Sequence, residues 1–213
     1  MSDIADDIEL LTAWRTGKRE AGAELFDRHY DSIARFFRNK VNGPSQDDLV
    51  QQTFLTCAEK ADRFRGASSF RTFLFGIAHN VLREHLRKAG RKLRREAGGD
   101  FDIDAVSVTA MGQSPVTVIA QQQEQRLLLE GLRTIPLHYQ VALELHYWDQ
   151  LTAREIAEIT GAPLGTVKTR LRDGKKVLAK KLAEVASSEQ VLQSTLDDLE
   201  GWAARMRIQA KVQ

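Results

Sequence analysis

Apolar residues recur at helical spacing through most of residues 1–88. Leu25, Ile33 and Phe37, for example, fall on one face of a helix, and few runs alternate in the way that half-buried strands require. The sequence Asn-Gly-Pro at 42–44 interrupts this pattern after a helix that ends near Lys40. The pattern therefore predicts that the first half of the chain is helical.

The segment DDLVQQTFLTCAEKADRF, residues 47–64, is predicted to form an amphipathic helix. Its apolar stripe comprises Leu49, Val50, Phe54, Leu55 and Ala58. Its opposite face is polar and acidic, with Asp47, Asp48, Gln51, Gln52 and Glu59. We expect this second face to point outward.

A further helix is predicted after the loop FRGASS, over the sequence SFRTFLFGIAHNVLREHLRKAGRK, residues 69–92. Phe73, Ile77, Val81 and Leu82 are apolar, and basic residues crowd towards its end. Residues 96–118 then lose helical periodicity and contain Gly98, Gly99, Gly112 and Pro115. This composition is typical of an extended or disordered connector. A domain boundary is predicted here.

Residues 151–182, LTAREIAEITGAPLGTVKTRLRDGKKVLAKKL, have the pattern of a helix-turn-helix. Thr152 and Glu155 form a capping box that starts a helix, and Gly161 suits a left-handed helix end. In the second helix the inward residues are Val167, Leu171, Leu178 and Leu182, and most of the outward ones are basic. The motif alone indicates DNA binding, and on that motif alone an ordinary regulator is as good an interpretation as any other.

The pattern as a whole predicts an all-α chain with two small helical domains, a flexible linker and a C-terminal extra helix. The four expected segments are 1–95, 96–118, 119–183 and 184–213. The last segment has a second capping box at Ser187 and Gln190, followed by apolar residues at spacings of four and three. It either packs against the second domain or has a regulatory role.

Charge is segregated along the chain, although the net charge of the 213 residues is only +2. Arg83 to Arg95 contains seven basic residues against one acidic residue, residues 96–118 contain four acidic and no basic residues, and Thr152 to Lys181 contains eight basic residues against three acidic ones. Two basic patches therefore flank an acidic connector, and basic patches favour nucleic-acid partners.

Neither catalysis nor a cofactor is predicted. The five histidines are scattered without nucleophiles or metal ligands at motif spacing, Cys57 is a lone cysteine expected to be buried, and no glycine-rich phosphate loop occurs. No uninterrupted apolar run reaches about 18 residues, and the first residues are acidic where a signal peptide would be basic. We therefore expect a cytoplasmic, non-enzymatic protein without metal, cofactor or membrane insertion.

The two halves together resemble the extracytoplasmic-function sigma factors of bacterial RNA polymerase. The sequences DDLVQQTFL and FRGASSFRTFLFGIAHNVLREHLRK resemble region 2 of that family, and IPLHYQVALELHYWDQLTAREIAEITGAPLGTVKTRL resembles region 4. The resemblance covers about residues 20–182, in the family's order. It implies a protein that binds core RNA polymerase and directs transcription from specific promoters.

In region 2, the resemblance implies a surface that docks on the clamp helices of the polymerase largest subunit. The residues implied in core binding are Asp47, Asp48, Leu49, Gln51, Gln52 and Phe54. Gln52 stands where the family often has Glu, so one charge of that surface is missing. A merely solvated face is the alternative.

The same resemblance implies that the FRGASS loop and the helix after it read the minus-ten element as single-stranded DNA. The residues that match the base pocket are Phe64, Ser68, Ser69, Ile77 and Asn80, and those that would meet phosphates are Arg83, Arg87 and Lys88. By pattern alone, Phe73 and Ile77 are better explained as core. Gly76 departs from the larger, often basic residue of the family.

In region 4, the resemblance places the second helix of the motif in the major groove of the minus-thirty-five element. Base-facing positions are Lys168, Thr169 and Arg172, and phosphate-facing positions are Arg170, Lys175 and Lys176. Asp173 and Gly174 depart from the family pattern, so we expect the helix to fray at its end.

The implied partners are core RNA polymerase, through its clamp helices and flap, promoter DNA, and an anti-sigma factor as a further candidate. In the family the linker threads through the channel for nascent RNA, where Asp100, Asp102 and Asp104 would mimic a polyanion; a plain solubilising linker is the alternative. A stand-alone helix-turn-helix regulator is the competing function, although no ligand-sensing module is visible beside the motif.

Overall fold

The computed structural model describes residues 2–41, 44–91, 95, 102–113 and 123–185. In this part of the chain the regular structure is helical, apart from one isolated antiparallel bridge between Ser107 and Pro136. The all-α prediction is confirmed, and the predicted C-terminal helix lies outside the described residues. Within the described residues, no helix combines the length and the apolar character needed to cross a bilayer.

The first domain comprises α1 (Ser2–Arg15), α2 (Arg19–Arg38), α3 (Pro44–Lys60), the short 3₁₀ helix η1 (Ala61–Arg63) and α4 (Phe70–Ala89). Gly22 lets α1 and α2 approach closely, because a Cβ there would lie 2.7 Å from the Trp14 ring. Proline is favoured at the first position of a helix, where α3 begins. Buried phenylalanines from α2 and α4 fill the centre of this domain, among them Phe36, Phe37, Phe70 and Phe75.

The second domain comprises α6 (Gln123–Thr134), α7 (Leu137–Tyr147), α8 (Ala153–Thr160) and α9 (Leu164–Val185). Leucines from α6, α7 and α9 pack around Trp148 to form a separate cluster. Gly131 of α6 allows close packing, because a Cβ at this position would lie 2.6 Å from the Leu182 side chain. Parts of α6, α7 and α9 therefore share a cluster of their own, whereas α8 packs in the main hydrophobic cluster.

The described part of the connector, residues 102–113, is folded. It contains the 3₁₀ helix η2 (Ile103–Ala105), which Asp102 caps by accepting a hydrogen bond from the Asp104 N–H. Ile103, Val108 and Met111 are buried in the main hydrophobic cluster. For these described residues, the prediction of an extended or disordered connector over 96–118 is wrong. Loss of helical periodicity rules out a regular helix, but it does not rule out an irregular segment that is anchored by a few spaced apolar residues.

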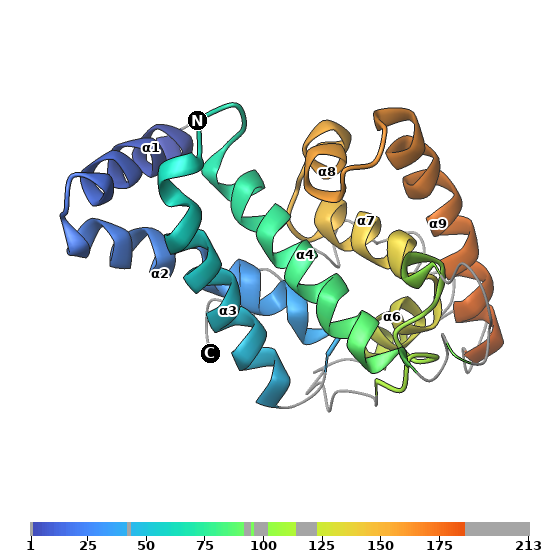
Figure 1. Ribbon diagram of the computed structural model, residues 1–213. Helices are drawn as coiled ribbons and strands as arrows, with labels where there is room; N and C mark the ends of the chain where they lie inside the picture. The colour runs from blue at the N-terminus through green and yellow to red at the C-terminus, as the bar shows by residue number, and fades with distance from the viewer. Residues whose placement is uncertain (1, 42–43, 92–94, 96–101, 114–122, 186–213) are drawn as a thin grey trace.

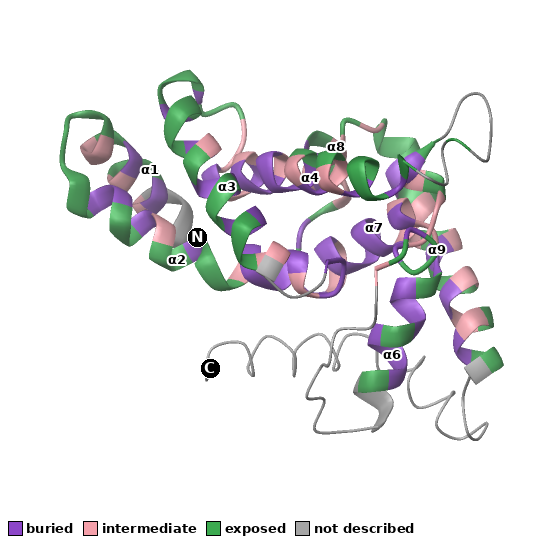
Figure 2. Cartoon of the chain, turned by 60° about the horizontal axis from the view of Figure 1, so that its bottom comes forward, coloured by how far each residue is buried: buried purple, intermediate pink, exposed green. Residues whose placement is uncertain are grey.

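The two domains pack against each other along α4. Figure 1 shows α4 between α1–α3 on one side and α6–α9 on the other, and its buried face is continuous in Figure 2. One hydrophobic cluster includes Leu82 and Leu86 of α4 together with Leu145 of α7 and Ile156 and Ile159 of α8. We call this packing of the domains the closed arrangement.

Candidate nucleic-acid interface

The helix-turn-helix of the second domain has the predicted geometry. Thr152 accepts a hydrogen bond from the Glu155 N–H at 3.3 Å, and the Glu155 carboxylate accepts one from the Thr152 N–H at 2.8 Å, so the capping box is complete. Gly161 ends α8 in the left-handed region with φ 68°. The predicted inward residues Val167, Leu178 and Leu182 are buried. The local sequence therefore fixes how α9 is presented.

Most predicted base and phosphate contacts of α9 are exposed, namely Lys168, Thr169, Arg172, Lys175 and Lys176. Arg172 donates two hydrogen bonds to its neighbour Asp173, at 2.9 and 3.1 Å. Arg170 differs from this group, because its side chain is half-buried and lines a cavity that faces α4.

The predicted fraying at Gly174 is wrong. The helix α9 continues to Val185, and Gly174 is buried against α7, where a Cβ would lie 3.2 Å from two Tyr139 carbons. The glycine is explained by this close approach of α9 to α7. Close packing offsets the roughly 1 kcal/mol that glycine costs within a helix.

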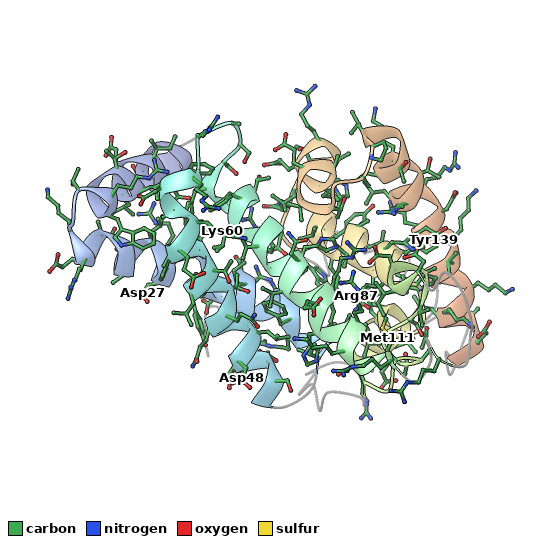
Figure 3. The ribbon with its side chains drawn as sticks, viewed as in Figure 1. Asp27, Asp48, Lys60, Arg87, Met111 and Tyr139 are labelled. Carbon is green, nitrogen blue, oxygen red and sulfur yellow. The ribbon has the colours of Figure 1, made fainter. Side chains whose placement is uncertain are left out.

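On α3, four of the six predicted core-binding residues form an exposed surface: Asp47, Asp48, Gln51 and Gln52. We call these four residues the acidic face; Asp48 is labelled near the lower end of α3 in Figure 3. Leu49 and Phe54 are 5% and 8% exposed and belong to the core. Phe54 packs on Phe26, with ring centroids 4.7 Å apart.

The predicted apolar stripe of α3 is partly wrong. Leu55 is 66% exposed, and Ala58 is exposed as well. Leu49, Val50, Phe54 and Cys57 form the buried stripe instead, because positions 49, 50, 54 and 57 follow the three-and-four spacing of one helix face. Leu55 thus joins Tyr30, which is 47% exposed, as a large apolar side chain on the surface of this domain.

The FRGASS loop is held by α1 and by the start of α4. Arg15 donates hydrogen bonds to the carbonyl oxygens of Ala61 and Phe64, the latter at 2.6 Å. Ser69 caps α4 by accepting a hydrogen bond from the Thr72 N–H at 3.1 Å. The loop is therefore fixed at both ends.

The predicted minus-ten residues fall into two groups. Phe64 and Ile77 are 8% and 6% exposed, and the Phe64 ring packs on Phe73 with centroids 5.0 Å apart, so these positions belong to the core of the closed arrangement. Ser68 and Ser69 are half-buried, and Asn80 is exposed. Among the predicted phosphate contacts, Arg87 and Lys88 are exposed near the end of α4, where Figure 3 labels Arg87.

Two protein-family models match the chain: sigma-70 region 2 over residues 25–92 and sigma-70 region 4 over residues 125–178. The chain is 28% identical over 175 residues to the ECF RNA polymerase sigma factor SigW of Bacillus subtilis, covering 80% of this chain and 94% of that protein. It is 27% identical over 188 residues to the ECF RNA polymerase sigma-E factor of Escherichia coli, covering 85% and 97%. The chain belongs to the extracytoplasmic-function sigma factor family.

The function of this sigma factor is to direct transcription initiation. Its fold is similar to that of CnrH in complex with the cytosolic domain of CnrY, with a TM-score of 0.62 at 21% identity over 85% of this chain and 99% of that one. It is also similar to the sigma factor RpoE in complex with the anti-sigma factor NepR from Bartonella quintana, with a TM-score of 0.57 at 21% identity over 77% and 97%.

The structure of this sigma factor adds a polar contact between the domains that sequence reasoning missed. Lys40, after α2, and Glu144 of α7 form an ion pair with side chains only 0% and 1% exposed. Asn39 donates a hydrogen bond to Glu144 at 3.2 Å, and Gln140 does so at 2.9 Å. Arg133 donates to the carbonyl oxygen of Asn39 at 3.0 Å.

A second ion-pair cluster joins the domains at Asp149, whose side chain is 2% exposed. Arg35 of α2 lies 2.9 Å from this carboxylate, and Arg71 of α4 lies 3.2 Å from it. One sequence signal could have indicated such contacts: Gln140 and Glu144 stand among leucines on a helix with few other polar positions. A charge at a core position requires a buried partner.

Proposed function

We propose that the acidic face of α3 binds the clamp helices of the polymerase largest subunit. Four polar side chains point to solvent from one stable helix, and the exposed Leu55 and Tyr30 add apolar contact area in the same domain. Interfaces commonly combine an apolar centre with a polar rim. Leu49 and Phe54 act in this proposal from beneath, by holding α3 in place.

The proposed core-binding face is tested by the substitution Asp48→Arg, with core affinity as the measurement. We expect the dissociation constant for core polymerase to rise by about tenfold or more, since reversing a charge opposes a complementary partner. Glu130→Arg is the matched control, because Glu130 is an exposed glutamate on α6 of the other domain. Equal affinity of the Asp48 variant and the wild type would remove α3 from the interface.

For the minus-ten element, we propose that Asn80 and Ser68 contact an unpaired base while Arg83, Arg87 and Lys88 follow the phosphates. Asn80 is exposed on the same helix as the three cations, which supports one continuous track along α4. Asn80→Ala should change promoter preference, whereas Asp27→Ala, a change at an exposed residue of α2, should not. Unaltered preference in the Asn80 variant would contradict this pocket.

For the minus-thirty-five element, Lys168, Thr169 and Arg172 are proposed to face bases, with Arg170, Lys175 and Lys176 on phosphates. Each lost phosphate contact should reduce the slope of log affinity against log salt by about one. Lys176→Gln should therefore lower the salt slope at every promoter, and Thr169→Ala should change sequence preference with little effect on that slope. The reverse result would exchange the proposed roles.

The proposed domain limits, 1–95 for region 2 and 119–183 for region 4, enclose both matched regions. The described connector acids have local roles in the closed arrangement: Asp102 caps η2, and Asp104 lies 3.1 Å from Arg83. A carboxylate on a proposed phosphate-binding arginine supports the polyanion role of the linker. The third acid, Asp100, lies outside the described residues.

The proposal includes an anti-sigma factor as a partner and the cytoplasm as the place of action. One similar structure is the sigma factor RpoE in complex with the anti-sigma factor NepR, and another is CnrH in complex with the cytosolic domain of CnrY. A protein that uses core polymerase works where transcription occurs. Co-purification of a partner that blocks core binding would identify the anti-sigma factor.

The experiment that tests the whole proposal is run-off transcription with core polymerase and genomic promoter fragments. Discrete starts preceded by a shared two-part motif would establish the promoter specificity. Tight duplex binding by the chain alone, with no binding to core, would favour a stand-alone regulator instead. The observation that carries the proposal is the pairing of the acidic face on α3 with a complete helix-turn-helix in the second domain.

A further inference from the structure

The last turn of α1 carries an arginine, Arg15, that contacts the start of the FRGASS loop. Its Nε donates a hydrogen bond to the Ala61 carbonyl oxygen at 3.1 Å. Its Nη2 donates to the same oxygen and to the Phe64 carbonyl oxygen, the latter at 2.6 Å. Ala61 begins η1 and Phe64 follows its end, so one guanidinium group joins α1 to both ends of the turn that leads into the loop.

Arginine suits this contact better than lysine does. The guanidinium group is a planar fork whose donors keep a fixed geometry, whereas an ammonium group is a single point charge on a flexible stem. The Phe64 N–H also donates to the Ala61 carbonyl oxygen at 3.2 Å, so the turn is closed by its own backbone as well. Arg15 therefore does not create the turn but fixes its place relative to α1.

The backbone that carries Arg15 is itself tied to the core of the first domain. Trp14, its neighbour, covers Gly22 of α2, where a Cβ would lie 2.7 Å from the indole ring. The Trp14 ring packs edge-on against Phe26, with centroids 5.1 Å apart, and Phe26 packs against Phe54 of α3 at 4.7 Å. The end of α1 is thus a fixed support from which the guanidinium group reaches the loop.

The tip of the loop, residues 65–67, is exposed rather than packed. At its centre, Gly66 has a φ of 71°, and a Cβ there would meet open space. The tip is held at its far end by Ser69, which caps α4, and at its near end by Phe64, whose carbonyl oxygen Arg15 holds. The shape of the tip therefore depends on its two ends.

We propose that Arg15 is a positioning residue for promoter recognition, which holds the FRGASS loop in the shape that reads an unpaired base of the minus-ten element. The inference rests on the proposed minus-ten contacts, of which Ser68 lies in this loop. A loop that already has its bound shape loses less conformational freedom on binding. Release of the loop should therefore affect discrimination between minus-ten sequences more than general affinity for DNA.

The test is run-off transcription by core polymerase saturated with the full chain. Three templates are compared: the promoter that run-off mapping delivers, this promoter with one minus-ten base changed, and this promoter with one minus-thirty-five base changed. The rate on the first template divided by the rate on the second is the minus-ten ratio. The rate on the first divided by the rate on the third is the minus-thirty-five ratio.

Arg15→Gln should lower the minus-ten ratio by about fivefold, equivalent to about 1 kcal/mol, and leave the minus-thirty-five ratio and the core affinity unchanged. Arg19→Gln is the matched control, because it removes the same charge from an exposed arginine at the start of α2, and it should change neither ratio. Arg15→Lys covers the case in which Arg15→Gln does not fold. It keeps the charge but cannot hold both carbonyl oxygens in a fixed geometry, so it should lower the minus-ten ratio by about twofold.

An unchanged minus-ten ratio in Arg15→Gln, or in Arg15→Lys where the first variant does not fold, would overturn the proposal. So would equal losses in both ratios. A lower rate on every template with both ratios intact would also overturn it, since less folded protein or a direct phosphate contact of Arg15 gives that result. A wild type that does not discriminate between minus-ten bases would refute the proposed minus-ten contacts and this inference with them, whereas equal discrimination by the wild type and Arg15→Gln would refute the role of Arg15 alone.

Discussion

Removing the buried charge of Glu144 should loosen the closed arrangement of the sigma factor. In the wild type, the Lys40 ammonium is fully buried and contacts the Glu144 carboxylate, the Phe36 carbonyl oxygen at 2.6 Å and the Phe36 ring at 4.3 Å. Glu144→Gln leaves this ammonium without a counter-charge. Breaking one partner of a buried ion pair costs about 3–5 kcal/mol, because the remaining charge stays desolvated.

The cost has an upper limit set by the domains themselves. Lys40 lies in the first domain and Glu144 in the second, so separation of the domains hydrates the stranded ammonium. If the domains stay together, the variant is therefore less stable to unfolding by about 3–5 kcal/mol. If separating the domains costs less free energy than this, the variant opens instead. Both outcomes follow from the same buried contact.

Two measurements distinguish these outcomes. Urea unfolding of the full chain reports the loss of stability as a shift of the midpoint. Small-angle X-ray scattering reports opening, because a compact chain of this length has a radius of gyration of about 17 Å and separated domains have a larger one. Lys40→Met combined with Glu144→Gln should lose less than the sum of the two single variants, since no charge is then stranded.

Glu130→Gln is the control for the loss of a carboxylate as such. Glu130 pairs with Arg126 at 2.9 Å, but both side chains are largely exposed, so its removal should cost less than about 0.5 kcal/mol. Our reasoning would be refuted by a Glu144→Gln variant that matches this control in stability and keeps the wild-type radius. The Lys40–Glu144 contact would then be hydrated in solution.

Five further outcomes are expected, four from single variants and one from the pH dependence of the wild type. Gly76→Ala should stabilise the chain by about 1 kcal/mol, because α4 has open space there, whereas Gly22→Ala should destabilise it by about 1–3 kcal/mol by overlapping the Trp14 ring; thermal unfolding measures both. Thr152→Ala should cost about 1 kcal/mol by removing the cap of α8, again by thermal unfolding. Stability should fall as the pH decreases from 6.5 towards about 4, by up to about 3 kcal/mol, because His79 binds a proton when unfolded but not when buried. His79→Gln should lose this part of the pH dependence. A variant with the same pH profile as the wild type would show that the His79 ring is already hydrated in the folded chain. The cations that face this ring are Lys40, Arg83 and Arg170.

Local features of the fold could be predicted from sequence because they depend on neighbouring residues. The capping box at Thr152 and the left-handed Gly161 involve backbone groups within a few positions of each other. Burial of Cys57, whose thiol pKa rises to about 12 through desolvation, follows from its place on the inner stripe of α3. Short-range patterns of this kind identify single helices well.

Contacts between distant residues were not predictable in the same way. Arg35 and Asp149 are 114 positions apart, and either could have been an ordinary solvated charge. Gly174 was misread because the helix α7 that approaches it lies far away in sequence. Leu55 was misplaced because α3 has apolar residues on several sides, so that adjacent positions compete for the inner stripe. Tertiary packing decides such cases.

Promoter geometry requires the closed arrangement to open. The minus-ten and minus-thirty-five elements are centred about 25 base pairs apart, or roughly 85 Å at 3.4 Å per step. The compact chain, with a radius of gyration of about 17 Å, cannot reach both elements at once. The two domains must therefore separate before the proposed contacts on α4 and α9 form together.

Binding to the acidic face alone should not cause this separation. Figure 1 places α4 between α3 and the second domain, so a clamp fragment docked on α3 would make the same contacts in either state. A ligand that binds two states with equal affinity does not shift the equilibrium between them. Shifting that equilibrium from 1:99 to 99:1 requires the ligand to bind the favoured state more tightly by about 5.5 kcal/mol. An isolated clamp fragment should bind the wild type and Glu144→Gln equally, while core polymerase with promoter DNA, which also engages the second domain, should bind the variant more tightly. Equal tightening with both ligands would mean that the acidic face is itself altered by the domain contact.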